Sequence, residues 1–158
     1  MIELPPPGIS LALDSDVFND WRYQRPAVLE VIRDYQLEFK ALPALTSFTV
    51  FEALIGFEKQ GARGGGLTDS QKRAREHAEG LVQSCRVLPF DGAAAEIAAY
   101  VFGRLGHAEG NRLRKDVFIA STAIAHKHGL ASRNRKDFEE IATHLPTNLK
   151  LYLAIWKR

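Results

Sequence analysis

The sequence of 158 residues is poor in cysteine and lacks long apolar runs. Its one cysteine, Cys85, excludes an internal disulfide framework and a cysteine-rich zinc site. No apolar run approaches the roughly 18 residues that a membrane-spanning helix needs. The opening segment MIELPPPGIS has neither the basic start nor the apolar stretch of a secretory signal. We therefore expect one domain spanning residues 1–158, in the reducing cytoplasm and away from membranes.

Two further site classes are excluded by spacing. The five histidines lack the spacing of metal ligands, because His126 and His128 are two residues apart and so do not share a helix face. The segment GARGGGLT has the glycine spacing of a phosphate loop, but Leu67 stands where that loop needs lysine. Neither a histidine metal site nor a nucleotide hydrolase is therefore expected.

Neither sign of charge dominates the chain. Lysine and arginine number 21 and the acids 19, which gives a net charge of +2. Hydrophobic residues make up 46% and charged residues 25%, as in an ordinary globular protein. If several acids gather in one pocket, the remaining surface carries a clear excess of positive charge. Such a surface suits a polyanion that must reach metal ions.

Strands and helices are expected to alternate along the chain. Short apolar runs predict strands over residues 9–14, 44–48, 85–90, 130–132 and 148–156. Helical spacing predicts helices over residues 26–39, 49–60, 69–83, 92–106, 114–128 and 134–142. Ser47 or Thr49, Thr68 and Asp91 are expected to begin the second, third and fourth of these as caps. The glycine-rich segment 61–66 is expected to be a flexible loop. This alternation predicts an α/β domain with a mainly parallel sheet, whose function lies beyond the carboxyl ends of the strands.

Four acids occupy unusual places in this pattern. Asp14 ends the apolar segment ISLAL, and Glu52 lies inside the apolar run VFEALIGF. Asp116 opens the run VFIASTAIA, and Asp137 follows a short strand and the polar segment RNRK. Burying a lone carboxylate costs several kcal/mol, about the scale that a divalent cation can offset. Oxygen ligands without cysteine or histidine favour Mg²⁺ or Mn²⁺ over zinc.

Each acid also has a structural interpretation. Asp14 could begin the turn after a strand, and Glu52 could lie on a polar stripe of its helix. Asp116 could be an acid in a first helical turn, favoured by the helix dipole. Asp137 would stand at the third helical position if Asn134 caps the helix, which is close to a capping box. These interpretations are compatible with function, since an acid at a helix start can also face a cleft.

The blocks around these acids resemble those of the PIN-domain family, and within it the VapC-type toxins of bacterial toxin–antitoxin pairs. LALDSDVFNDW resembles the family's opening strand and turn, and TSFTVFEALIGFEK its second block. LPFDGAAAEIAAYVFGRL resembles the intervening segment, and RLRKDVFIASTAIAHKHGLASRNRKDFEEI the third and fourth blocks. Together the blocks span about residues 11–140 in the family's order. Four blocks in order are more specific than any one alone.

The resemblance implies a Rossmann-like α/β/α sandwich and a Mg²⁺- or Mn²⁺-dependent endoribonuclease, the toxin of such a pair. It implies that the catalytic and metal-binding acids are Asp14, Glu52, Asp116 and Asp137. Family toxins are usually homodimers, and a small antitoxin neutralises them by inserting a segment near the active site. Asp16 stands where the family commonly has asparagine, and Ser132 where threonine is common. We expect Asp16 to shape the turn, although it could also add a fifth acid.

The chemistry expected of this site is hydrolysis of a phosphodiester bond. A metal lowers the pKa of bound water and stabilises charge that develops on the phosphate. Cleavage would leave a 5′ phosphate and a 3′ hydroxyl without help from the RNA 2′-hydroxyl. Polar groups expected to support the acids or contact substrate are Ser15, Ser132 and Asn134. Basic residues expected to bind RNA phosphates, or simply to form a solvated surface, are Arg112, Arg114, Lys115, Arg133, Arg135 and Lys136.

Two other functions remain open from the sequence. A catalytically silent PIN-like module that binds RNA or protein would keep the fold while its acids fail to assemble around metal. A doubly wound protein that binds a small molecule would have an apolar pocket at the switch point of its sheet. Retention of all four acids favours the nuclease.

Overall fold

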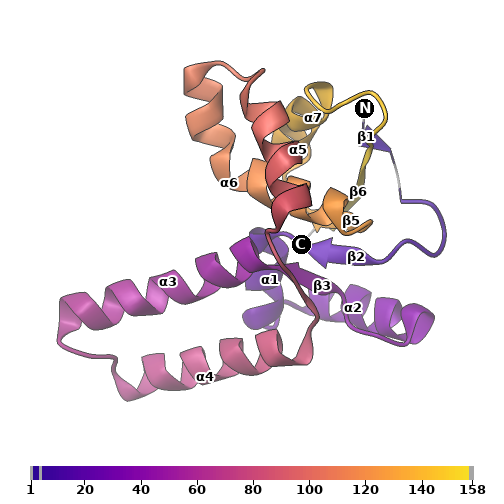
Figure 1. Cartoon of the computed structure of the whole chain (residues 1–158). Helices are drawn as coiled ribbons and strands as arrows, with labels where there is room; N and C mark the ends of the chain where they lie inside the picture. The colour runs from indigo at the N-terminus through magenta and orange to yellow at the C-terminus, as the bar shows by residue number, and fades with distance from the viewer. Residues whose placement is uncertain (1, 4, 157–158) are drawn as a thin grey trace.

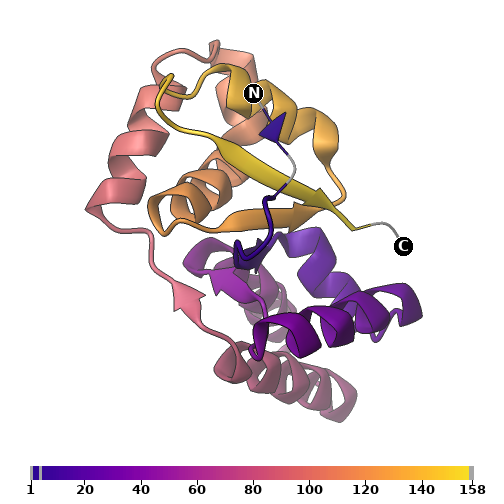
Figure 2. The ribbon, with the colours of Figure 1, turned by 90° about the vertical axis from the view of Figure 1, so that its right-hand side faces the viewer.

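A parallel sheet forms the centre of the molecule. The computed structural model describes residues 2–3 and 5–156. The strands are β1 (Ile2–Glu3), β2 (Leu11–Leu13), β3 (Ala44–Thr46), β4 (Val87–Leu88), β5 (Gly129–Ser132) and β6 (Leu151–Ile155). They lie in the order β1-β6-β5-β2-β3-β4, and every pair of neighbours is parallel. Figure 2 shows β5 and β6 side by side, with β1 against β6.

Helices cover both faces of this sheet (Figure 1). They are α1 (Ser15–Arg22), α2 (Pro26–Phe39), α3 (Ser47–Gly64), α4 (Asp69–Ser84), α5 (Gly92–Phe102), α6 (His107–Ala125) and α7 (Arg135–Thr143). Helices α5, α6 and α7 pack on one face, and α1 and α2 on the other. The expected α/β/α sandwich with a parallel central sheet is therefore confirmed.

Each face of the sheet has its own apolar core, because side chains alternate along a strand. On β2, Ala12 belongs to the core beneath α5, α6 and α7, which also contains Phe138 and Leu130. Leu11 and Leu13 belong to the opposite core, beneath α1 and α2. The central strands β2, β3 and β5 are buried on both faces and read as continuous apolar runs, as parallel strands do.

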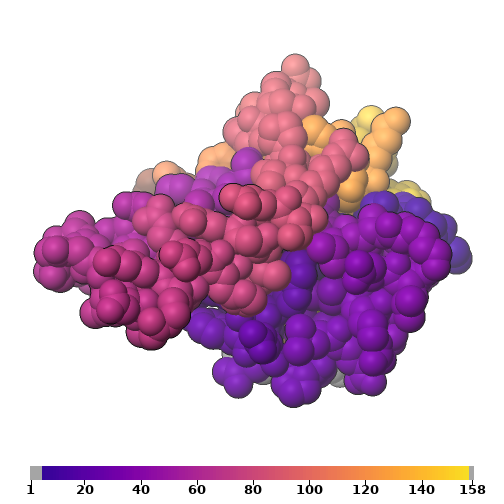
Figure 3. All heavy atoms as spheres, turned by 90° about the horizontal axis from the view of Figure 1, so that it is seen from below, coloured from indigo at the N-terminus to yellow at the C-terminus, as the bar shows by residue number. Residues whose placement is uncertain are grey.

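Helices α3 and α4 extend beyond this body as an antiparallel pair (Figures 1 and 3). Thr68 begins α4 with a capping box that Gln71 completes. Gly65 ends α3 with a φ of +69°, a conformation that favours glycine. No helix in the described part of the chain is both long and apolar enough to span a bilayer.

Several expected boundaries are wrong. The segment 61–66 is not a loop throughout, because α3 continues to Gly64. The cap of α3 is Thr46, whose hydroxyl accepts from the Thr49 N–H, instead of Ser47 or Thr49. Helix α1 was not expected at all. Helix α6 begins at His107 instead of 114, so the interpretation of Asp116 as a first-turn acid is also wrong.

Candidate active site

The four predicted acids come from four different elements around the carboxyl ends of the central strands. Asp14 follows β2 and caps α1. Glu52 lies on α3, Asp116 on α6, and Asp137 in the first turn of α7. The charges of Asp137 and Glu52 both act on Asp116, and that of Asp116 acts on Asp14. The structure therefore brings all four into one electrostatic cluster.

Asp14 is the most deeply held of these acids. It is 5% exposed, and its Oδ1 accepts a hydrogen bond of 2.7 Å from the Ser15 N–H. Its Oδ2 accepts one of 2.6 Å from the hydroxyl of Ser132, which is fully buried at the end of β5. The Asn134 N–H donates in turn to that hydroxyl, at 2.9 Å. The three predicted supporting residues Ser15, Ser132 and Asn134 thus all lie at the site.

Two of the carboxyls have pKa values well above that of an ordinary aspartate. Burial raises the pKa of Asp14 to about 7, and the negative charges of Asp16 and Asp116 add to this effect. Burial also raises the pKa of Asp116 to about 6, helped mainly by the charge of Asp137. Each carboxyl therefore lies in an environment that penalises its own negative charge. A bound cation would relieve that penalty.

Glu52 and Asp137 are each engaged by a basic side chain of α6. The Lys115 Nζ lies 2.7 Å from Glu52 Oε1, and the Ser15 hydroxyl donates to the other oxygen of Glu52. The hydrogen bond to Glu52 is the main reason that the pKa of Lys115 is raised. Arg112 pairs with Asp137 and, at 2.5 Å, with Glu140.

The Asn134 amide also donates to Asp137, at 2.7 Å, and Asn134 caps α7 as expected. Burial pushes the pKa of Asp137 up, but hydrogen bonds from Asn134 and Arg112 outweigh it and leave that pKa below its ordinary value. The structural interpretation of Asp137 as an acid at a capped helix start is therefore confirmed, and it coexists with a place in the acid cluster.

These contacts decide how the acids fit a metal ion. The donor set is all oxygen, which suits Mg²⁺ or Mn²⁺. As the side chains are oriented, no three histidine, cysteine, aspartate or glutamate side chains within residues 2–3 and 5–156 are arranged to share an ion. Asp14 and Asp116 fit a cation by their burial and mutual repulsion. Glu52 and Asp137 lie beside them but face Lys115 and Arg112.

Two acids of α1, Asp16 and Asp20, also lie at the site. The sequence did not single out Asp20, and Asp16 was expected mainly to shape the turn. Both lie 3.3 Å from the Arg133 Nε through their Oδ2 atoms, and Asp20 is 2% exposed. The Oδ1 of Asp16 is buried and has no hydrogen-bond partner among the described residues. The charge of Asp16 also acts on Asp14 and Asp116. The i,i+4 spacing of the two acids is the signal that could have found them, had α1 been expected.

The predicted RNA-binding residues are largely engaged with neighbouring side chains. Besides Arg112, Lys115 and Arg133, Arg135 pairs with Glu139 at 2.5 Å, and Arg114 donates to the Asn111 side chain at 2.9 Å. Lys136 is exposed beside Asp137. Of these bases, Lys115 and Arg112 contact acids of the cluster directly, and the contact of all six with RNA stays a prediction.

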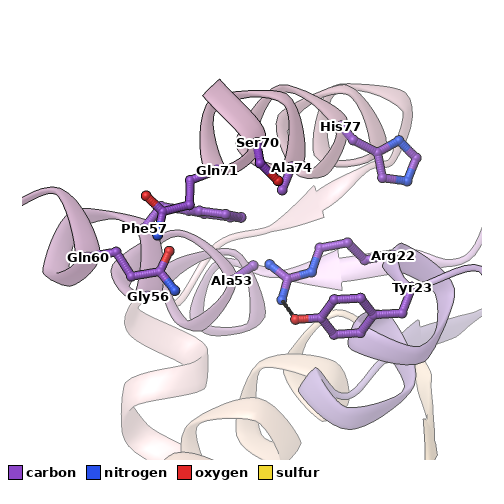
Figure 4. Close-up of a pocket in the computed structure, with 10 residues that line it drawn as sticks. All are labelled: Arg22, Tyr23, Ala53, Gly56, Phe57, Gln60, Ser70, Gln71, Ala74 and His77. Carbon is purple, nitrogen blue, oxygen red and sulfur yellow. Dashed lines mark hydrogen bonds between the residues drawn. The ribbon is translucent and has the colours of Figure 1, made fainter. Parts of the chain in front are cut away.

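A groove lies between α1, α3 and α4 (Figure 4). It has a volume of about 250 Å³, and its lining residues are Arg22, Tyr23, Ala53, Gly56, Phe57, Gln60, Ser70, Gln71, Ala74 and His77. The Arg22 guanidinium lies 5.3 Å from the Phe57 ring centre and donates to the Tyr23 hydroxyl at 2.9 Å. The groove shares helix α3 with Glu52, but none of the four acids is among its lining residues.

Comparison with known proteins places the chain in one family. The family model described as PIN domain matches residues 11–143. No curated protein matches the sequence significantly. A chain of the DNA-bound VapBC structure from Salmonella typhimurium has a TM-score of 0.66 and 19% identity, with 94% of this chain and 99% of that chain covered.

Two further solved structures show the same fold. A chain of VapBC2 from Rickettsia felis, bound to a promoter DNA fragment, has a TM-score of 0.64 and 17% identity, covering 99% of this chain and 100% of that chain. A chain of VapBC-5 from Mycobacterium tuberculosis has a TM-score of 0.58 and 21% identity, covering 95% of this chain and 99% of that chain. At such identities the likeness establishes the fold and leaves the chemistry to the residues of the site.

Proposed function

The chain belongs to the PIN-domain family, and from this premise we propose that it is a Mg²⁺- or Mn²⁺-dependent endoribonuclease, the VapC-type toxin of a toxin–antitoxin pair. One observation carries the proposal: buried Asp14 and half-buried Asp116 repel each other where the charges of Glu52 and Asp137 also act. A fold gains nothing from such repulsion unless the site takes up a cation. A cytoplasmic location, where RNA is available, accompanies the proposal.

Each residue of the cluster has a role in this proposal. Asp14 and Asp116 hold the ion, and Glu52 and Asp137 complete its surroundings. The ion supplies Lewis acidity toward water and the scissile phosphate. Ser132 fixes the orientation of Asp14 through their hydrogen bond of 2.6 Å, as outer partners of metal ligands do.

The basic rim has the complementary role. Arg135 and Lys136 are exposed beside the cluster, where they can attract the phosphates of an RNA strand. Arg133 is tied to Asp16 and Asp20, so we assign it to holding α1 against the end of β5. Direct contacts with RNA are therefore assigned first to Arg135 and Lys136.

The direct test is cleavage of RNA by the purified chain. We expect Mg²⁺ or Mn²⁺ to support cleavage and EDTA to abolish it, with 5′ phosphate ends on the products. A chain that binds RNA in both conditions without cutting it would instead be the catalytically silent module. That alternative is supported by the engagement of Glu52 and Asp137 with Lys115 and Arg112.

We further propose that a small antitoxin docks in the groove between α1, α3 and α4. The solved VapBC structures include VapBC-5 from Mycobacterium tuberculosis, a member of the VapBC family of toxin–antitoxin systems, which supports such a partner. The groove combines apolar walls with the Arg22 guanidinium, so it suits an apolar segment that carries an acid. A segment bound there would contact α3, the helix that also carries Glu52.

Filling the groove is expected to weaken antitoxin binding. A Cβ added at Gly56 meets no atom within 4 Å, so Gly56→Leu should fold normally and occupy the groove. We expect at least about a tenfold rise in the dissociation constant for the product of a small neighbouring reading frame, or about 1.4 kcal/mol. RNA cleavage should persist.

Gly80→Leu is the matched control, because Gly80 is also an exposed helical glycine with open space and lies outside the groove. Equal affinity of both variants for that product would exclude the groove as its docking site.

The proposal includes a homodimer. Large apolar side chains remain partly exposed on α3, on α5 and before α5, including Phe51 at 51%, Phe90 at 37% and Tyr100 at 37%. Phe51 also packs against Phe48, with ring centres 5.5 Å apart. Covering such rings with a second copy would remove apolar surface from water.

A further inference from the structure

The ammonium group of Lys115 already places a positive charge inside the acid cluster. Its ammonium nitrogen lies 2.7 Å from Glu52 Oε1, and the negative charges of Glu52, Asp116 and Asp14 all act on it. Three of the four proposed metal-binding carboxylates therefore share the field of one lysine. The other oxygen of Glu52 accepts from the Ser15 hydroxyl, so both oxygens of this carboxylate are engaged.

We propose that Lys115 is an intramolecular competitor of the divalent cation, and that its ammonium must leave Glu52 before a metal ion can use that carboxylate. The inference rests on the proposed metal-dependent function and deepens it by naming what controls the affinity of the site. It also gives a physical reason why no three acids of the described part of the chain are arranged to share an ion, since Glu52 is oriented toward Lys115.

The exposure of the two partners supports an exchange of this kind. The Lys115 side chain is 64% exposed, whereas that of Glu52 is 17% exposed. A long, solvated side chain can move into water at low cost, while the carboxylate stays fixed by α3 and the Ser15 hydroxyl. Glu52 is therefore a stationary acceptor for which a lysine and a metal ion compete.

Arg112 differs from Lys115 in this respect. Its guanidinium joins two carboxylates of α7, Asp137 and Glu140, and so has two partners to leave. Asp137 is also held by the Asn134 amide. The exchange is consequently assigned to the Lys115–Glu52 pair, and Asp137 keeps its partners when an ion first binds.

Calorimetric titration with Mn²⁺, without RNA, tests the inference. Lys115→Gln removes the competing charge, and we expect the dissociation constant for Mn²⁺ to fall at least about tenfold, since unit charges interact strongly at this separation. Lys115→Arg keeps the charge and should bind Mn²⁺ no more tightly than the unaltered chain. Lys59→Gln is the control for loss of one positive charge, because exposed Lys59 lies on the same helix as Glu52 but beyond its reach.

A double-mutant cycle separates competition from general electrostatics. In a Glu52→Gln background the lysine has no carboxylate to block, so Lys115→Gln should then change the Mn²⁺ affinity much less. An equal change in both backgrounds would contradict the inference. So would equal affinities of the unaltered chain, Lys115→Gln and Lys59→Gln, although such a result would leave the metal-dependent nuclease in place.

Failure of the proposed function would give a different result in the Mn²⁺ titrations. If neither the unaltered chain nor Lys115→Gln binds Mn²⁺, the metal site itself is absent and both proposals fall. If Lys115→Gln alone binds Mn²⁺, the competitor is strong enough to close the site, which supports the inference. Circular dichroism of each metal-free variant confirms that the compared proteins are folded.

Discussion

Asp116→Asn is expected to abolish metal-dependent RNA cleavage while making the metal-free protein more stable. Asparagine keeps the size of the side chain but removes a negative charge that is penalised by burial and by the charges of Asp137 and Glu52. Loss of that charge also removes a proposed ligand of the ion. We expect cleavage to fall by more than about 100-fold, the upper end of what outer partners of a metal site contribute.

The stability of the same variant is measured by thermal unfolding in EDTA. A rise in the melting temperature of about 2–4 °C is expected, the shift that about 1 kcal/mol gives in a protein of this size. Asp34→Asn is the control, because Asp34 is an exposed acid on α2 with only a surface ion pair to Arg33. It should change neither quantity appreciably.

A variant Asp116→Asn that still cleaves RNA at the normal rate would remove Asp116 from the catalytic machinery. A variant that loses both activity and stability would indicate that Asp116 supports the fold, contrary to the strain inferred for its charge.

Raising the pH from about 4 to about 7 is expected to destabilise the metal-free protein. In the unfolded chain Asp14 loses its proton near its ordinary pKa of 3.8, whereas in the folded protein its pKa is about 7. The folded state therefore binds more protons between these values. Its stabilisation is complete below about pH 4 and is lost as the pH rises through about 7. The difference between the two pKa values corresponds to at most about 4 kcal/mol.

The raised pKa of Asp116 has the same effect, and the stabilisation that it contributes is lost as the pH rises through about 6. His128 acts in the opposite direction, because burial lowers its pKa and the unfolded chain gains the proton as the pH falls below about 6.5. The contribution of Asp14 is therefore obtained from the difference between the unaltered chain and Asp14→Asn, in which the part due to His128 cancels.

Urea unfolding at several pH values measures this difference. The unaltered chain should lose stability relative to Asp14→Asn as the pH rises from about 4 to about 7, and saturating Mg²⁺ should restore it by binding the ionised carboxylates. A difference that does not change with pH would show that the Asp14 carboxyl titrates normally, and the strained site would then be refuted.

Much of the fold was predictable from local patterns. Apolar periodicity located most helices and strands, and Thr68, Asp91 and Asn134 were correctly predicted to begin their helices. A cap acts through hydrogen bonds to residues two or three positions away, so its signal is contained in a short stretch of sequence. The family resemblance was likewise confirmed, because the PIN-domain model matches residues 11–143, close to the span of about 11–140 over which the resemblance was seen.

Local patterns failed where tertiary packing decides the structure. Helix α1 holds three acidic or basic side chains and an asparagine within eight residues, and it buries Val17, Phe18 and Trp21 against the sheet. The first turns of α6 are polar, so the apolar run after Asp116 led to a predicted helix start at residue 114, which is later than the observed start at His107. In both places contacts with other elements extend a helix that sequence alone does not mark.

The sequence by itself determined which acids occupy apolar segments, because the cost of burying a carboxylate makes Asp14, Glu52 and Asp116 conspicuous without any coordinates. Only the tertiary structure decided which base each acid meets. Lys115 reaches Glu52 because α6 packs beside α3, and Arg112 reaches Asp137 because α6 packs beside α7. Ion pairs between distant segments depend on this packing, because electrostatic attraction depends on the distance between the charges in space. The number of residues between them along the chain does not enter.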